Sequence, residues 1–187
     1  MKKLFFILAL LPFLFSCNNS EEKRDSELQS LNEQRDEFYN KLTSSDFDFE
    51  EVRNLADNYE SFIENYPKDI VCSKLTIELA NIYVNFLGDP DKAIELYSSI
   101  EEKYHDSEYL PESYFAIANI YNDRLHKLGK ASEYYRKLTE EFPDHELSKQ
   151  AKFLMENIGK TPEELLDVIL KKKAEREKTN KNDSIIN

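Results

Sequence analysis

The stretch Leu79-Ala80-Asn81-Ile82-Tyr83 decides the fold, because it returns twice at a fixed interval. Ile117-Ala118-Asn119-Ile120-Tyr121 begins 38 positions later, and Met155-Glu156-Asn157-Ile158-Gly159 begins 38 positions after that. Alignment of 79–107 with 117–145 gives 11 identities in 29 positions. A constant period in this range predicts stacked supersecondary units, each of which is too small to bury a core alone.

Hydrophobic residues recur at helical spacing in the segments between the turn signals. Gly is scarce, with 3 residues in 187, while Tyr and Phe number 11 and 12. This composition favours helices packed through aromatic side chains over a sandwich or barrel, whose turns need Gly. The sequence predicts an all-α protein of about four antiparallel helical hairpins. The expected helices cover 25–43, 48–65, 70–86, 91–104, 109–126, 130–142, 146–158 and 162–177.

The N-terminus resembles a secretory signal peptide of a bacterial lipoprotein. Met1-Lys2-Lys3 is positively charged, and the apolar run that follows is too short to span a bilayer as an ordinary helix. Leu14-Phe15-Ser16-Cys17 then resembles a lipobox. The resemblance implies cleavage before Cys17 and attachment of acyl chains such as palmitate to Cys17. The alternative is an ordinary signal peptide that is cut elsewhere, with Cys17 incidental.

The residues after Cys17 bear on location and on domain organisation. Asn18 stands where Asp commonly signals retention in the inner membrane, so we expect the outer membrane, facing either the periplasm or the cell surface. We expect four parts. They are a signal peptide at 1–16, a lipidated tether at 17–24, a helical repeat domain at 25–177 and a disordered polar tail at 178–187.

Composition argues against several functions. The net charge of −12 repels phosphate backbones, so nucleic acid is a poor candidate partner. Cys72 is the one cysteine besides Cys17, and there are three His residues, which supports neither a disulfide framework nor a zinc site. No phosphate-binding loop, nucleophile elbow or other catalytic constellation is recognisable. We therefore expect a protein without enzymatic activity, bound metal or cofactor.

From 55 to 159 the repeats resemble tetratricopeptide repeats. Small residues recur where the two helices of a hairpin approach closely, as at Ala80 and Ala118 in the first helix and at Ala93 and Ala131 in the second. The resemblance implies a right-handed solenoid in which the first helices line a groove for a protein or peptide. The unit has four residues more than the usual 34. This longer unit looks like repeats in the lipoprotein of the outer-membrane β-barrel assembly machine and in the periplasmic coordinator of the Tol–Pal system.

By the repeat alignment, Asn81, Asn119 and Asn157 occupy the groove-facing position of their first helices. An amide offers two donors and an acceptor, so a ladder of Asn could hold the backbone of an extended peptide. Alternatively, these amides form hydrogen bonds between adjacent helices and only order the stack. Tyr83 and Tyr121 are candidate binding anchors or, alternatively, core residues.

These observations predict a non-catalytic, membrane-anchored protein-interaction scaffold of the bacterial cell envelope. Two other functions stay open at this point. One is a surface lipoprotein that binds a small ligand or a glycan, although the chain has no Trp for stacking on a sugar. The other is a structural subunit of a larger outer-membrane complex, which an exposed apolar stripe on residues 28–42 would favour.

Overall fold

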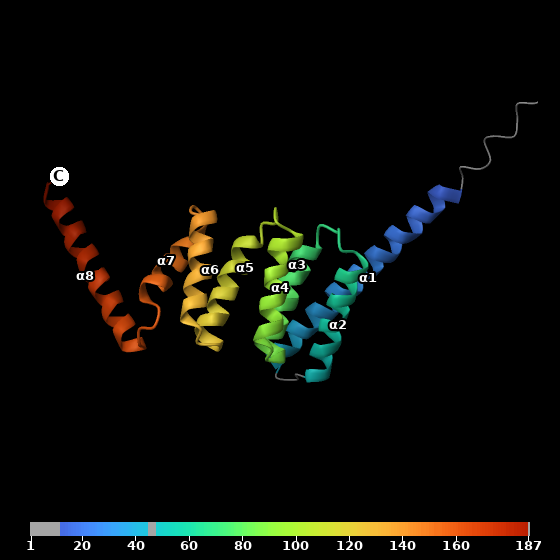
Figure 1. Ribbon diagram of the computed structural model, residues 1–187, viewed down its shortest axis with the longest axis horizontal. Coiled ribbons are helices and arrows are strands. Elements are labelled where there is room, and N and C mark those ends of the chain that lie inside the picture. The colour runs from blue at the N-terminus through green and yellow to red at the C-terminus, as the bar shows by residue number, and fades with distance from the viewer. Residues whose placement is uncertain (1–11, 45–47, 187) are drawn as a thin grey trace, which may run out of the picture. The chain divides into compact units, whose positions relative to one another are not determined.

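The computed structural model describes the backbone of residues 12–44 and 48–186, and within these ranges it is all helical (Figure 1). Most of the expected signal peptide therefore lies outside the described residues. Short turns join consecutive helices, which pack as hairpins, so the predicted fold class is confirmed. The helices are α1 (Pro12–Ser44), α2 (Phe49–Asn65), α3 (Cys72–Ile82), α4 (Pro90–Lys103), α5 (Leu110–Asn119), α6 (Leu128–Glu141), α7 (Glu146–Asn157) and α8 (Pro162–Ile186).

The chain divides into two compact units, where the sequence had suggested one repeat domain at 25–177. Unit 1 runs from Met1 to Leu110 and contains α1 to α4. Unit 2 runs from Pro111 to Asn187 and contains α6 to α8 and all of α5 except its first residue. Such a division is natural in a repeat array, in which each repeat contacts only its sequence neighbours.

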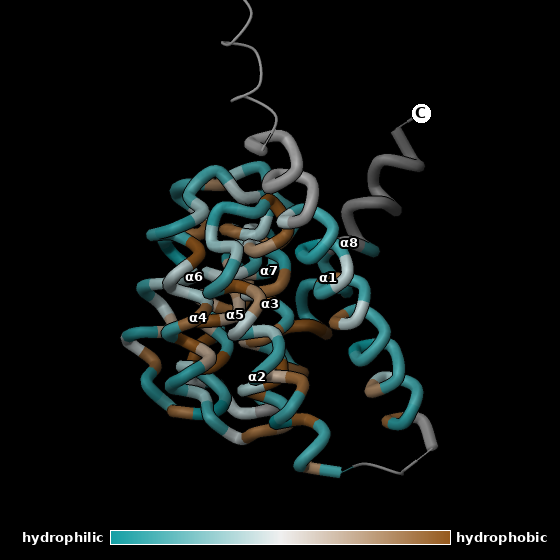
Figure 2. The backbone as a smooth tube through the Cα atoms, turned by 90° about the vertical axis from the view of Figure 1, so that its right-hand side faces the viewer, coloured by the Kyte–Doolittle hydropathy of each residue, from teal (hydrophilic) through white to brown (hydrophobic). Residues whose placement is uncertain are grey.

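The core of unit 1 joins the first three helices. Leu31 and Phe38 of α1 are buried in one cluster with Tyr59 of α2 and Leu79 of α3. Figure 2 shows α1 as mostly hydrophilic with short hydrophobic segments. Leu28 and Leu42 of α1 also pack against this cluster. The apolar stripe of 28–42 is thus covered within the chain, which gives no support to the structural-subunit alternative.

The small residues of the repeat lie where the helices of a hairpin meet. Ala80 of α3 and Ala93 of α4 are fully buried in unit 1, as are Ala118 of α5 and Ala131 of α6 in unit 2. The second helices also bury one Tyr each, Tyr97 and Tyr135, at equivalent positions. An Ala at the crossing lets two helix backbones approach closely. The sequence correctly predicted these positions as contacts between the two helices of a hairpin.

Two of the first helices, α3 and α5, continue into wide π-helical turns. Tyr83–Leu87 follows α3, and Ile120–Arg124 follows α5. A π turn bonds each N–H to the carbonyl five residues back, so it takes up one residue more than an α turn. Each π turn can therefore accommodate one of the residues by which this unit exceeds the usual 34.

Two helix boundaries differ from those predicted. Residues 17–24, expected as a tether, are helical, because α1 begins at Pro12 rather than near residue 25. Arg24 on this extension forms an ion pair with Asp69 and so fastens it to the turn between α2 and α3. Residues 178–186, expected as a disordered tail, continue α8. The sequence after Lys173 contains no Gly or Pro that would end a helix.

The start of α8 is capped by Thr161 and Glu164. The Thr161 backbone N–H donates to Glu164 Oε2 at 2.8 Å, and the Glu164 backbone N–H donates to Thr161 Oγ1 at 3.3 Å. This reciprocal pair is a capping box, which satisfies two of the unbonded donors at a helix start.

In the part of the chain that the structure describes, no helix combines the length and hydropathy needed to cross a membrane.

Candidate functional site

Two of the three predicted Asn residues are held by a tyrosine of the following helix. In unit 1, the Tyr97 hydroxyl of α4 donates to Asn81 Oδ1 of α3 at 2.7 Å. In unit 2, the Tyr135 hydroxyl of α6 donates to Asn119 Oδ1 of α5 at 2.5 Å. Burial raises the pKa of Tyr135 to about 12, so this hydroxyl remains a donor at neutral pH. The same Tyr–Asn hydrogen bond therefore joins the two helices in both hairpins.

The hydrogen bond from the tyrosine uses the oxygen of each Asn amide and does not involve the amide nitrogen. Both Asn side chains are partly exposed, and across the described residues no acceptor is bonded to either Nδ2 atom. Each amide therefore presents two N–H donors in an orientation that its tyrosine fixes. Such donors match the carbonyl oxygens of a peptide backbone. The hydrogen bond to the oxygen agrees with the alternative in which these amides order the hairpin, and contact with a peptide through the nitrogen stays a prediction.

Asn157 differs from the other two. It is only 5% exposed, and its Nδ2 donates to the Phe153 carbonyl oxygen at 2.6 Å. Its Oδ1 accepts from Lys160 Nζ at 2.6 Å. The position that follows it by 16 residues is Lys173, where the other repeats have their tyrosine. The amide of Asn157 is thus used within α7 and the turn that follows it.

Tyr83 and Tyr121 are half-buried and make contacts within their own units. The Tyr83 hydroxyl donates to Glu60 Oε1 of α2 at 3.0 Å, and burial raises the pKa of Tyr83 to about 12. The ring of Tyr121 lies 5.9 Å from that of Tyr134, centroid to centroid, with the Lys127 ammonium 5.9 Å from the Tyr121 ring. Both tyrosines therefore contribute to packing, and a partner would reach only part of each ring.

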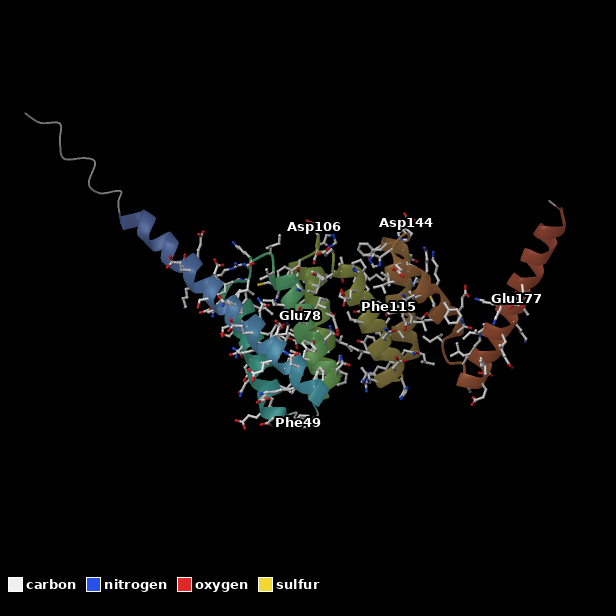
Figure 3. The ribbon with its side chains drawn as sticks, turned by 180° about the vertical axis from the view of Figure 1, so that it is seen from behind. Phe49, Glu78, Asp106, Phe115, Asp144 and Glu177 are labelled. Carbon is white, nitrogen blue, oxygen red and sulfur yellow. The ribbon has the colours of Figure 1, made fainter. Side chains whose placement is uncertain are left out.

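Unit 1 also contains a polar cluster that the sequence reading missed. Glu78, labelled in Figure 3, accepts a hydrogen bond from the Tyr59 hydroxyl at 2.6 Å. Arg35 of α1 and Lys74 of α3 each lie 3.7 Å from the Glu78 carboxylate. Position 43, which precedes Asn81 by 38 residues, is Thr, so Tyr59 has no Asn equivalent in its hairpin and bonds to Glu78 of the next one. The spacing of 19 residues in this pair gave no signal in the sequence.

Cys72 is a buried packing residue at the start of α3. Its Sγ donates to the Tyr66 carbonyl oxygen at 3.1 Å, and burial raises the pKa of the thiol. Over the ranges 12–44 and 48–186, no group of three or more His, Cys, Asp or Glu residues is arranged to hold a metal ion.

Comparison with known protein families supports the interpretation of the repeats. Tetratricopeptide repeat models match residues 78–107 and residues 111–145. These two segments contain the Tyr97–Asn81 and Tyr135–Asn119 hydrogen bonds, respectively. Comparisons with curated proteins and with solved structures gave no significant match. Residues 78–145 thus hold tetratricopeptide repeats, a module that typically mediates protein–protein interaction and is typically not catalytic.

Proposed function

We propose that the chain is a non-catalytic scaffold of the bacterial cell envelope, anchored in the outer membrane by lipid on Cys17, which binds a protein partner through the first helices of its hairpins. The single observation that carries the binding part is the pair of oriented amides at Asn81 and Asn119. Each has its oxygen bonded to a tyrosine and its nitrogen open. Each of the two hairpins thus offers its own amide, whose N–H donors match a carbonyl oxygen of a peptide backbone.

The anchor rests on the sequence of the first 17 residues. A positive start, an apolar run and the motif Leu14-Phe15-Ser16-Cys17 occur in the order that lipoprotein signals require. Each buried methylene of an acyl chain contributes about 0.8 kcal/mol to membrane attachment, so two or three chains would hold the protein firmly. The absence of Asp at position 18 favours the outer membrane over the inner one.

The experiment is capture of partners from cross-linked envelopes with two matched double variants. Asn81→Ala with Asn119→Ala removes the amides. Tyr97→Phe with Tyr135→Phe removes the same two hydrogen bonds but keeps the amides. Because both variants lose equivalent bonds within the hairpins, any difference between them reports on the amide donors themselves. We expect the Asn variant to lose the partner and the Tyr variant to retain most of it.

Equal capture by the two variants would show that the amides only order the hairpins, and the binding proposal would then be wrong. Circular dichroism on both variants establishes that they remain helical. The anchor is tested separately with Cys17→Ser, which should release the protein from the membrane fraction. Mass spectrometry of the wild type should find acyl chains on an N-terminal Cys17.

A further inference from the structure

The turn between α2 and α3 contains the most exposed large hydrophobic side chain of the described residues. Ile70 is 89% exposed, and it lies between Asp69, which is bonded to Arg24, and Val71, which packs against the core of unit 1. Pro67 and Lys68 of the same turn are exposed as well. One exposed apolar residue is unremarkable in itself. Its position relative to the start of α1 distinguishes it from the other exposed apolar residues.

Arg24 fixes the start of α1 against this turn. Its Nε donates to Asp69 Oδ2 at 2.6 Å, and its Nη2 donates to Asp69 Oδ1 at 2.8 Å. Bidentate pairs of this kind are strong and hold a defined geometry. Asp69 Oδ1 also accepts the backbone N–H of Val71 at 3.0 Å, which shapes the turn on either side of Ile70. The guanidinium lowers the pKa of Asp69, so the pair is charged at neutral pH.

Cys17 precedes Arg24 by seven residues. Seven helical residues span about 10 Å, and even a fully extended chain of that length spans only about 25 Å. Figure 1 shows that the turn between α2 and α3 lies at the end of unit 1 toward which the start of α1 points. An acyl anchor at Cys17 would therefore bring this turn to the surface of the bilayer.

We infer that the turn at Tyr66–Val71 contacts the membrane surface, with the Ile70 side chain buried among the lipid headgroups and the first acyl carbons. This inference rests on the proposed lipid anchor at Cys17. The acyl chains supply the affinity for the membrane, while the turn and its Arg24–Asp69 pair set the orientation of unit 1. The partner of this surface is a phospholipid bilayer, and Lys68 beside Ile70 suits the phosphate groups at its surface.

A single tryptophan can report this contact, because the chain has none of its own. Ile70→Trp places the probe in the turn. Phe49→Trp is the matched control, since Phe49 is 61% exposed and begins α2, whereas the turn follows the end of α2. Figure 3 labels Phe49 at the end of α2 away from this turn. Both variants are purified as full-length lipidated protein in vesicles of phosphatidylethanolamine and phosphatidylglycerol, with and without lipids brominated on the acyl chains.

The inference predicts that brominated lipid lowers the emission of the Ile70→Trp variant by about two-fold or more, with an emission maximum shifted to the blue, because interfacial side chains lie within ~10 Å of the acyl boundary. The Phe49→Trp variant should keep its emission. Adding Arg24→Gln to Ile70→Trp should reduce the quenching, since the turn is then no longer fastened to the start of α1.

Equal quenching of the two probes, or quenching of neither in a protein that carries its lipid, would overturn the inference while leaving the anchor intact. Intact mass measured on the same samples distinguishes this result from failure of the anchor. A chain without acyl groups on Cys17 would contradict the proposed anchor and with it the inference, but it would leave the proposed binding through Asn81 and Asn119 untouched.

Discussion

Gly88 and His126 are 38 residues apart in the repeat, and Gly88 directly follows the first π turn whereas His126 lies two residues after the second. Both have left-handed backbones, with φ of 68° for Gly88 and 53° for His126. A residue with a Cβ at such a position costs roughly 1–2 kcal/mol relative to a right-handed conformation. Glycine avoids this cost but loses about 0.5–1 kcal/mol through its greater backbone freedom in the unfolded chain. We therefore expect His126→Gly to raise the free energy of unfolding by about 0.5–1 kcal/mol.

The reverse substitution, Gly88→Ala, should lower the free energy of unfolding by a similar amount. A Cβ at Gly88 would meet no atom within 4 Å, so the loss comes from the backbone conformation rather than from a clash. Gly129→Ala is the control. A Cβ there also meets open space, but Gly129 has no left-handed φ, and Ala is the better helix former.

Equilibrium urea unfolding, followed by circular dichroism, measures the three variants. His126→Gly and Gly129→Ala should raise the unfolding midpoint, and Gly88→Ala should lower it. The reasoning would be refuted if His126→Gly had no effect or a destabilising one. It would equally be refuted if Gly88→Ala and Gly129→Ala shifted the midpoint in the same direction.

Three further predictions concern packing and charge. Ala118→Leu should cost roughly 1–3 kcal/mol of stability, because Ala118 is fully buried at a helix crossing, and an unchanged urea midpoint would contradict this packing. Burial raises the pKa values of Tyr83 and Tyr135 to about 12, above the ordinary value of 10.0, so stability should be constant below pH 10 and fall as the pH rises toward 12. Tyrosinate absorbance during alkaline titration would contradict this if both groups ionised at the ordinary value. Asp69→Asn should cost roughly 1–2 kcal/mol at neutral pH by breaking the pair with Arg24. The pKa of Asp69 is lowered from 3.8, so the difference from wild type should shrink as the pH falls below that value, and a difference independent of pH would argue against the ion pair.

The fold was predictable because the period of the sequence is also the period of the structure. Ala80 and Ala118 are buried at equivalent positions of successive hairpins, and so are Tyr97 and Tyr135. Because each pair recurs at the same spacing, the spacing alone indicated repeated hairpins. The helix start at Thr161 was predictable for a local reason, because its capping bonds join residues three apart.

The contacts that shape the candidate site were only partly predictable. The alignment placed Asn81 next to the small residue on the first helix of its hairpin, but the bond from Tyr97 to its oxygen depends on how two helices cross. Glu78 pairs with Tyr59 across hairpins, and Arg24 pairs with Asp69 over 45 residues, so neither pair leaves a periodic trace.

The most direct test of the protein-binding claim is photo-cross-linking from two exposed positions of unit 1. A photoreactive residue at Asn85, one turn after Asn81, is compared with one at Glu95 on α4, the second helix of the same hairpin. The measurement is the yield of cross-linked partner in intact cells, read by mass spectrometry. Our account predicts a discrete protein cross-linked from position 85 and little or none from position 95. A partner cross-linked from position 95 alone, or equally from both positions, would contradict the proposal that the first helices form the binding surface.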